Sequence, residues 1–283
     1  MAKTNQLYTS VVGKKAVPSR YGLLNSETLV TEDTVRWEGG LALSSTLCRS
    51  KTENVEVCDP SHKSVIKESI TSRYPMYEPF AVEIEVECST FGSLDHDFRA
   101  EVLEAMELHR GTAIEHEFWT GALSKLTTSG TSENRYLADS TTTDITPTTG
   151  TAVSVRRGIA LLEAAATSVG RVNIHAPRDV VSLISDDLVV VDDHLETVLG
   201  SIVSAGTGYT RTGPTGLDAA GTKRWIYVTG PVSVFLSEID IYSSQPNETV
   251  DTNTNTTTVR AHQFAAPVFD GCDVYAVLVD LSL

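Results

Sequence analysis

The sequence predicts an α+β fold that contains one long helix, a sheet beside it and an α/β lobe. Residues 93–126 keep a helical period for longer than any other part of the chain. Residues 80–88 alternate apolar and acidic side chains, which is the period of a half-buried strand. After residue 153, helix-like and strand-like segments follow one another, a pattern typical of an α/β unit.

The composition is that of a globular chain with an acidic balance. The chain has 283 residues, of which 41% are hydrophobic, enough for the core of one large domain or two. Its formal net charge of -15 argues against free-standing nucleic-acid binding, which depends on Lys and Arg neutralising phosphates. An acidic protein could still form the wall of a shell whose contents must be bound only weakly.

Cysteine spacing and hydropathy favour an intracellular, soluble product. None of the CxxC or Cys/His spacings of zinc or redox sites occurs, so the cysteines are expected to be reduced structural thiols. They are Cys48, Cys58, Cys88 and Cys272. The sequence shows no charged-then-apolar leader and no apolar run of the roughly 18 residues that a membrane span requires.

The first 50 residues have little sustained periodicity and begin with a basic stretch. Lys3, Lys14, Lys15 and Arg20 occur among the first twenty residues without any acid. Two interpretations stay open: a partly disordered tail, or an arm that becomes ordered by lying across a neighbouring subunit. The apolar residues around Trp37 favour the arm.

A projecting hairpin is predicted after the arm. Residues 54–58 and 80–88 read as strands, and the polar, charged segment 61–77 between them is long enough to be the projecting hairpin rather than a tight turn. A two-stranded ribbon is only marginally stable alone, so this one is expected to meet a partner surface.

The helix over 93–126 is predicted to pack on a sheet. Ser93 is the expected N-cap, with Asp95 and Asp97 in the favourable first turn. Its apolar stripe is wider and less regular than the heptads of a coiled coil. The stripe consists of Leu94, Phe98, Val102, Leu103, Met106, Ala113, Ile114, Phe118, Trp119, Leu123 and Leu126.

The rest of the chain is predicted to form a hinge, a lobe and closing strands. Residues 127–152 are rich in Thr, Ser and Gly and read as a hinge loop. Helices are expected over 155–168 and 178–185, a strand over 171–177, and a long flexible glycine-rich loop over 206–221. Strands over 225–229 and 232–236 flank a Gly230-Pro231 turn, and 239–242 extends the second. Residues 259–264 and 274–279 are the last strands, the latter buried on both faces.

Motif searches assign no catalytic, cofactor-binding or metal-binding residue. His109 and His116 share a helix face, but the HExxH pattern lacks its second His, so hydrogen-bonded or surface histidines are expected. The segment Gly206-Thr207-Gly208 has two glycines of a dinucleotide fingerprint, with Arg211 in place of the third. An acidic cluster is predicted to form a solvated face, because it lacks the alternation of a calcium-binding loop. It comprises Asp186, Asp187, Asp192, Asp193 and Glu196.

The order of these parts resembles the major capsid protein of tailed double-stranded DNA bacteriophages, which has the Hong Kong 97-type capsid fold. The resemblance covers nearly the whole chain and is similar in local detail to capsid proteins of phages that infect actinobacteria. The matching segments are IEHEFWTGAL (114–123), the helix-strand unit over 155–184, SAGTGY (204–209), WIYVTGPVSVF (225–235) and APVFDGCDVYAVLVDL (266–281).

The resemblance implies a domain division. Residues 1–50 would be the N-arm and 51–88 the extended loop. Residues 89–152 and 239–269 would form the peripheral domain with its spine helix, and 153–238 and 270–283 the axial domain. The glycine-rich loop would be a candidate for the axis of hexamers and pentamers.

The resemblance also implies a structural, non-enzymatic function. Copies of the chain would assemble into hexamers and pentamers of an icosahedral shell in the virion, formed in the host cytoplasm. Further partners would be a separate scaffolding protein, a portal and packaged double-stranded DNA contacted non-specifically, without a membrane.

Two features of some family members have no fixed counterpart. A cleaved scaffolding segment before the arm is not seen, so a separate scaffold or a processed form is implied. A Lys-Asn cross-link assisted by a buried Glu would draw on Lys63 or Lys67 with Asn247 and Glu248, but no motif fixes these residues.

Two alternatives remain open. One is an encapsulin, a bacterial nanocompartment shell of the same fold, whose usual amphipathic first helix has no match in residues 1–20. The other is a small-molecule α/β enzyme, which would be expected to show a glycine loop or convergent acid/base residues.

Overall fold

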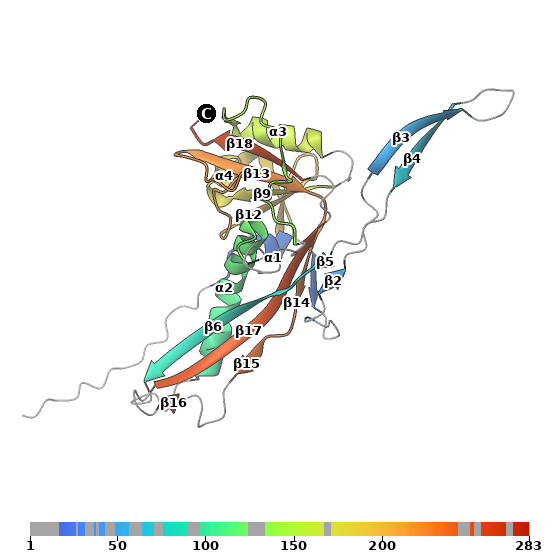
Figure 1. Ribbon diagram of the computed structural model, residues 1–283. Helices are drawn as coiled ribbons and strands as arrows, with labels where there is room; N and C mark the ends of the chain where they lie inside the picture. The colour runs from blue at the N-terminus through green and yellow to red at the C-terminus, as the bar shows by residue number, and fades with distance from the viewer. Residues whose placement is uncertain are drawn as a thin grey trace, which may run out of the picture.

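The computed structural model describes residues 17–26, 28–31, 37, 40–42, 49–56, 64–70, 76–89, 97–123, 134–166, 171–242, 250–251, 256–269 and 274–282. Within these ranges, a six-stranded sheet carries the long helix α2 (Phe98–Thr120) and an eight-stranded sheet forms a second lobe. Figure 1 shows the second lobe at one end of α2, with the long strands of the first sheet running beside the helix.

The six-stranded sheet is organised around its longest strand, β17 (Thr256–Phe269). Strand β6 (Phe80–Ser89) pairs with it in antiparallel register from Ala265↔Phe80 to Thr256↔Ser89. On its other side lie β14 (Val232–Leu236), β15 (Asp240–Tyr242) and β16 (Val250–Asp251), and β1 (Thr28–Thr31) pairs with β14 in parallel. The alternation predicted for 80–88 is confirmed: Val82 is buried while Glu83, Glu85 and Glu87 are exposed.

Helix α2 buries its apolar stripe against this sheet. Val102, Met106, Ile114, Phe118 and Trp119 are buried in one cluster with side chains of β14 and β17, which confirms the predicted packing on a sheet. The predicted ends of the helix are wrong. Ser93 lies outside the described residues, and Asp97 is the N-cap, accepting hydrogen bonds from the backbone amides of Arg99 and Ala100. Gly121 ends the helix with φ 58°, a left-handed conformation that glycine adopts without strain.

The eight-stranded sheet has the order β10-β11-β12-β9-β13-β18-β7, with β8 also pairing with β18. These strands are β10 (Leu188–Val191), β11 (His194–Thr197), β12 (Ile202–Gly206), β9 (Asn173–Pro177), β13 (Lys223–Thr229), β18 (Tyr275–Asp280), β7 (Thr143–Asp144) and β8 (Val153–Ser154). Helices α3 (Val155–Ala165) and α4 (Arg178–Leu183) and the short 3-10 turn η3 (Ser185–Asp187) complete the lobe. The predicted α/β pattern and the buried last strand are therefore confirmed.

The two predicted strands around Gly230-Pro231 are confirmed, and they belong to different sheets. Strand β13 pairs with β9 and β18 in the eight-stranded sheet, whereas β14 pairs with β1 and β17 in the other sheet. The turn is thus a crossing between the two sheets. Residues 240–242 form a separate strand on β17 and do not extend β14.

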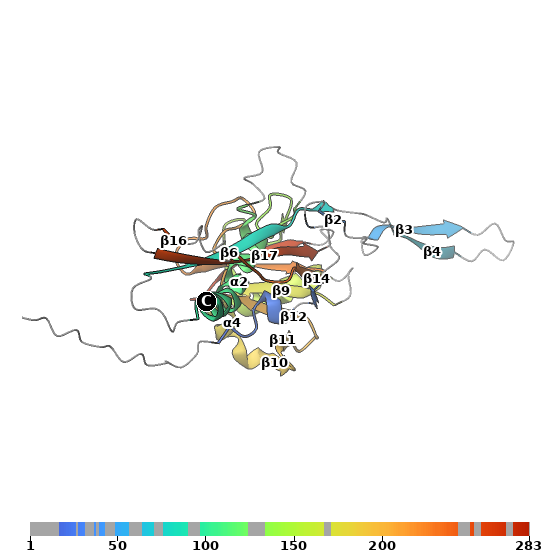
Figure 2. The same ribbon diagram turned by 90° about the horizontal axis from the view of Figure 1, so that it is seen from below.

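A hairpin is present after the arm, but its strands differ from those predicted: β3 (Arg49–Glu56) pairs with β4 (Ser64–Ile70), whereas residues 80–88 belong to the six-stranded sheet. Figures 1 and 2 show this ribbon lying away from both sheets. Nearer the body, β2 (Leu41–Ala42) pairs with β5 (Met76–Tyr77), and α1 (Leu23–Ser26) lies against α2. Trp37 stacks on Phe264 with ring centroids 6.0 Å apart, on the face of β17 that is turned away from α2.

Candidate functional site

A buried carboxylate joins the long helix to both the amino-terminal segment and the α/β lobe. Glu115 on α2 is 3% exposed. One of its oxygens accepts a hydrogen bond from the amide of Leu23 at 2.9 Å, and the other accepts from the amide of Gly208 at 2.9 Å and the hydroxyl of Thr207 at 3.2 Å. Burial raises the pKa of this carboxyl, while the donated hydrogen bonds oppose the rise.

The glycine-rich segment 206–221 packs against the helix in its first half. A Cβ atom on Gly208 would lie 2.1 Å from the carbonyl oxygen of Thr112, so only glycine permits this approach. Tyr209 is 8% exposed, and the carbonyl of Thr212 accepts hydrogen bonds from Trp119 and Tyr227. The loop is therefore not free over its whole length as predicted: residues 208 and 209 are buried, and 215–218 are exposed.

A neutral histidine lies where the two cores meet. His175 on β9 is fully buried, and its ring nitrogens lie 3.2 Å from the Tyr209 hydroxyl and 2.9 Å from the Thr229 hydroxyl. Burial lowers its pKa to about 3. Phe118 contacts the His175 ring edge-on at 5.0 Å and the Phe269 ring at 5.3 Å, so one helix residue touches both sheets.

The residues weighed for metal or cross-linking chemistry do not converge in the described part of the chain. His109 and His116 are both exposed on α2. Lys67 lies in β4, while Lys63, Asn247 and Glu248 lie outside the described residues. Within the described ranges, no group of three or more His, Cys, Asp or Glu is placed so that it could hold a metal ion. No helix in the same ranges is long and apolar enough to cross a membrane.

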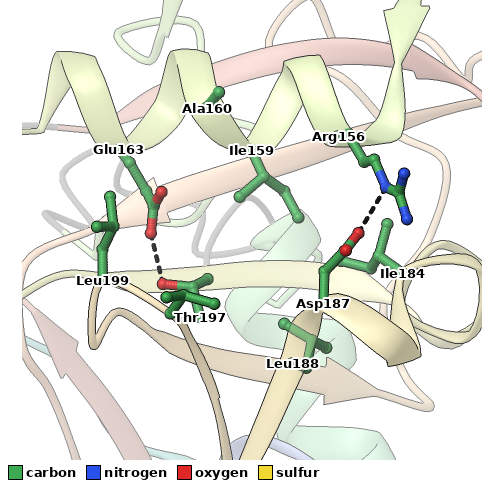
Figure 3. A pocket seen from close by; sticks show the side chains of 10 residues that line it. Arg156, Ile159, Ala160, Glu163, Ile184, Asp187, Leu188, Thr197 and Leu199 are labelled. Atoms are coloured by element: carbon green, nitrogen blue, oxygen red, sulfur yellow. Dashed lines mark hydrogen bonds and ion pairs between the residues drawn. The ribbon is translucent and has the colours of Figure 1, made fainter.

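An apolar groove of about 300 Å³ lies in the α/β lobe (Figure 3). Its walls come from α3, from η3 and the start of β10, and from the turn between β11 and β12. The apolar lining consists of Ile159, Ala160, Ile184, Leu188, Val198 and Leu199. An ion pair between Arg156 and Asp187 closes one end at 2.6 Å.

The turn that forms one rim of the groove exposes two aliphatic side chains. Residues 197–200 form a β-turn in which the amide of Gly200 donates to the carbonyl of Thr197 at 2.9 Å. Val198 and Leu199 occupy its corner and are 82% and 79% exposed, although turn corners usually carry polar residues or glycine. Glu163 on α3 holds this turn by accepting hydrogen bonds from Thr197 at 2.5 Å and Ser201 at 2.9 Å.

The predicted acidic cluster surrounds a ribbon beside the groove. Strands β10 and β11 form a hairpin whose two-residue turn is Asp192-Asp193, and both aspartates are exposed, as are Asp186 and Asp187. Val189 and Val190 on β10 are 51% and 58% exposed. Glu196 is instead engaged by His194, at 2.7 Å, and by Arg171.

Comparison with known proteins places the chain in a fold class. No family profile and no curated protein matches the sequence. The spine helix on a long-stranded sheet, the separate ribbon and the α/β lobe are those of the Hong Kong 97-type capsid fold, which confirms the predicted fold class.

Three solved structures illustrate the likeness. A chain from Mycobacterium phage Adephagia has a TM-score of 0.56 at 11% identity, covering 97% of this chain and 94% of that one. The capsid of the empty GTA particle gives 0.58 at 9% identity, covering 99% and 98%. The holo-SrpI encapsulin complex from Synechococcus elongatus gives 0.56 at 11% identity, covering 98% and 95%. At these identities the likeness establishes the fold.

Proposed function

We propose that the chain is the major capsid protein of a tailed bacteriophage, a structural protein that assembles from copies of itself into hexamers and pentamers of an icosahedral shell. The observation that carries the proposal is the capsid-type fold together with the β3–β4 ribbon, which lies away from its own body (Figure 1). A ribbon of two strands gains little stability from its own pairing, so a neighbouring copy is the natural source of its missing contacts.

We assign the domains of the capsid fold according to the two sheets. Residues 1–50 act as the N-arm and 51–88 as the extended loop that reaches the next copy. The helix α2 and the six-stranded sheet are the peripheral domain, and the eight-stranded sheet is the axial domain. The division implied by the resemblance assigns 89–152 and 239–269 to the peripheral domain and 153–238 and 270–283 to the axial domain. Sheet membership would move the strand 232–236 to the peripheral domain and the strand 143–144 to the axial domain.

The proposal includes partners and a place. The shell would enclose double-stranded DNA with non-specific contacts, and the net charge of -15 would keep those contacts weak. A separate scaffolding protein and a portal would take part in assembly in the host cytoplasm, and the finished protein would reside in the virion capsid.

The encapsulin reading is the second candidate, because the SrpI encapsulin complex has the same TM-score as the Adephagia chain. It predicts shells that hold a protein cargo. The capsid reading predicts shells that hold nuclease-protected DNA.

Electron microscopy and nuclease protection on particles purified from producing cells separate these functions. Closed shells whose DNA survives nuclease treatment support the capsid, and shells filled with a single co-purifying enzyme support the encapsulin. A chain that stays a monomer at high concentration, with and without a scaffolding partner, would contradict both.

A further inference from the structure

We infer that the apolar groove of the α/β lobe receives the β10–β11 ribbon of a second copy of this chain, in a head-to-tail contact. The inference rests on the proposed shell function and names the surface by which neighbouring lobes join. It concerns residues 156–201, all of which are described except 167–170.

The first argument is the concentration of exposed apolar side chains in one stretch. Leu183, Val189, Val190, Val198 and Leu199 are each 51% exposed or more and fall within residues 183–199. Burying aliphatic side chains is favourable in proportion to the area removed from water, so a partner that covers these residues gains stability from their burial. Glu163 fixes the turn that presents Val198 and Leu199, so the rim is already shaped before a partner arrives.

The second argument is the construction of the ribbon. Consecutive residues of a strand point to opposite faces, so the exposure of both Val189 and Val190 means that each face of β10 carries an uncovered apolar side chain. Strand β10 is also the end strand of its sheet, and its sequence LVVV contains none of the Lys or Pro residues that usually protect such edges. A strand of this kind is suited to insertion against another surface.

The third argument is charge complementarity. Arg156 lines the groove, and the next residue in the first turn of α3, Arg157, is exposed and makes no ion pair within the described residues. The tip of the ribbon exposes Asp192 and Asp193, for which the same part of the chain also shows no ion pair. A ribbon entering the groove of the next copy would bring its aspartates toward these arginines.

A head-to-tail contact fits the position of the two surfaces. Leu188 at the base of the ribbon already lines the groove of its own chain, so groove and ribbon are neighbours that cannot fill one another. A groove filled by the next copy leaves that copy's own groove open for a third. Such a heterologous contact closes into a ring when the rotation between copies allows it.

The test uses charge reversal and its repair by a charge swap in one chain. Arg157→Glu and Asp193→Lys should each raise the subunit concentration needed for particle formation by about tenfold or more, since a matched pair becomes a like-charge pair. The double variant that carries both substitutions should assemble at nearly the wild-type concentration. In the double variant, the carboxylate introduced at position 157 of each copy meets the ammonium introduced at position 193 of the next copy, in hexamers and pentamers alike. Arg157 is preferred to Arg156, which is held by Asp187.

Two substitutions of exposed leucines distinguish a specific role of the groove from non-specific hydrophobic association. Leu199→Ser should raise the required concentration by about tenfold. Leu123→Ser removes a side chain that is 45% exposed outside the lobe, just after α2, and should leave the required concentration unchanged. Thermal unfolding of each isolated variant checks that the subunit still folds.

The outcomes are distinguishable. If the wild type forms particles and all these variants assemble equally well, the inference is wrong and the proposed function stands. Impairment of both single variants without repair in the double variant means that the two charges do not meet between copies, which also overturns it. If the wild type forms no particles under any condition, the proposed function fails and this inference fails with it.

Discussion

At the scale of single residues, Glu115 combines a stabilising network with an electrostatic cost. Burial raises its pKa above the ordinary value for Glu, so the folded chain retains a proton in a pH window where the unfolded chain has lost it. The free energy of unfolding contributed by this group therefore decreases as pH rises through that window. The three hydrogen bonds that Glu115 accepts offset this cost, because their buried donors would otherwise lack an acceptor.

We predict that Glu115→Gln changes the pH profile in a specific direction. The variant lacks the buried charge, so its free energy of unfolding relative to wild type should be more favourable at about pH 7 than at about pH 5. Urea unfolding at the two pH values measures this difference. Glu107→Gln, an exposed position on the same helix, is the control and should show no such trend. An equal difference for Glu115→Gln at both pH values would sink the idea.

The pH dependence of stability that His175 contributes has the opposite sign to that of Glu115. Its pKa is lowered to about 3, so between pH 6.5 and pH 3 the unfolded chain binds a proton at this histidine and the folded chain does not. The contribution of His175 to the free energy of unfolding is complete above pH 6.5 and is lost at about 1.4 kcal/mol per pH unit as pH falls toward 3.

We predict that His175→Gln flattens the loss of stability between about pH 6 and pH 4. Chemical unfolding across that range tests it, with exposed His109→Gln as the control, and an unchanged slope would contradict it.

These two residues show why the sequence did not reveal the junction. Glu115 lies beside His116 in a helix full of charged residues, and a 3.6-residue period alone does not tell a buried carboxylate from its exposed neighbours. Its partners, Leu23 and Gly208, lie 92 and 93 residues away, so their meeting depends on the tertiary fold. His175 is more accessible to prediction, because it falls within a short run read correctly as a buried strand.

At the scale of elements, α2 is the member on which both cores depend. Trp119 is fully buried between Tyr209 and Tyr227, with ring centroids 4.8 Å from each. We predict that Trp119→Ala or Phe118→Ala lowers the free energy of unfolding by about 3–5 kcal/mol, because a cavity remains where the ring was. Denaturant unfolding measures the loss. Leu123→Ala, at a half-exposed position after the helix, should cost far less, and similar losses at all three positions would show that the wrong face was placed inward.

Two glycines on facing elements should respond in opposite ways. A Cβ at Gly208 would lie 2.1 Å from a helix carbonyl oxygen, whereas at Gly111 it would meet only a side-chain carbon of Leu24 at 3.6 Å. We predict that Gly208→Ala destabilises the subunit by about 3 kcal/mol through backbone displacement. Gly111→Ala should stabilise it by up to about 1 kcal/mol, because alanine is the better helix former. Thermal unfolding of the two variants tests both signs, and a tolerated Gly208→Ala would mean that the loop can move away from α2.

The type of each element, helix or strand, is largely predictable because the period of its apolar residues reports which face is buried. The residues at which an element ends, and the strands with which it pairs, are not predictable in this way. Asp97 caps α2 in place of Ser93, since either residue can accept from a helix amide and the sequence does not choose between them. The Gly230-Pro231 turn is visible in the sequence, but the two strands that flank it enter different sheets. The turn residues alone do not specify the sheet to which each strand belongs. An apolar pair followed by glycine is the signal in the sequence for the exposed Val198-Leu199 corner.

At the scale of the whole molecule, the first residues of the chain divide into two functional classes. Residues 1–16 lie outside the described part and contain Lys3, Lys14 and Lys15 without any acid. Residues 19–23 contact the body of the subunit. Arg178 donates to Ser19 and to the carbonyl of Arg20, Leu23 is fully buried, and its amide supports Glu115.

We predict that loss of residues 1–16 impairs assembly more than it impairs folding of the subunit. If these residues act as an arm on a neighbouring copy, deleting them should change the free energy of unfolding of the isolated subunit by less than about 0.5 kcal/mol. The same deletion should reduce particle yield or particle stability, measured by electron microscopy and sedimentation. Deleting residues 1–26 should lower the free energy of unfolding by about 3 kcal/mol or more, since it leaves a cavity at Leu23 and an unpaired buried carboxylate oxygen at Glu115. Equal loss of folding in both deletions would place the arm in the subunit core and remove its proposed role between copies.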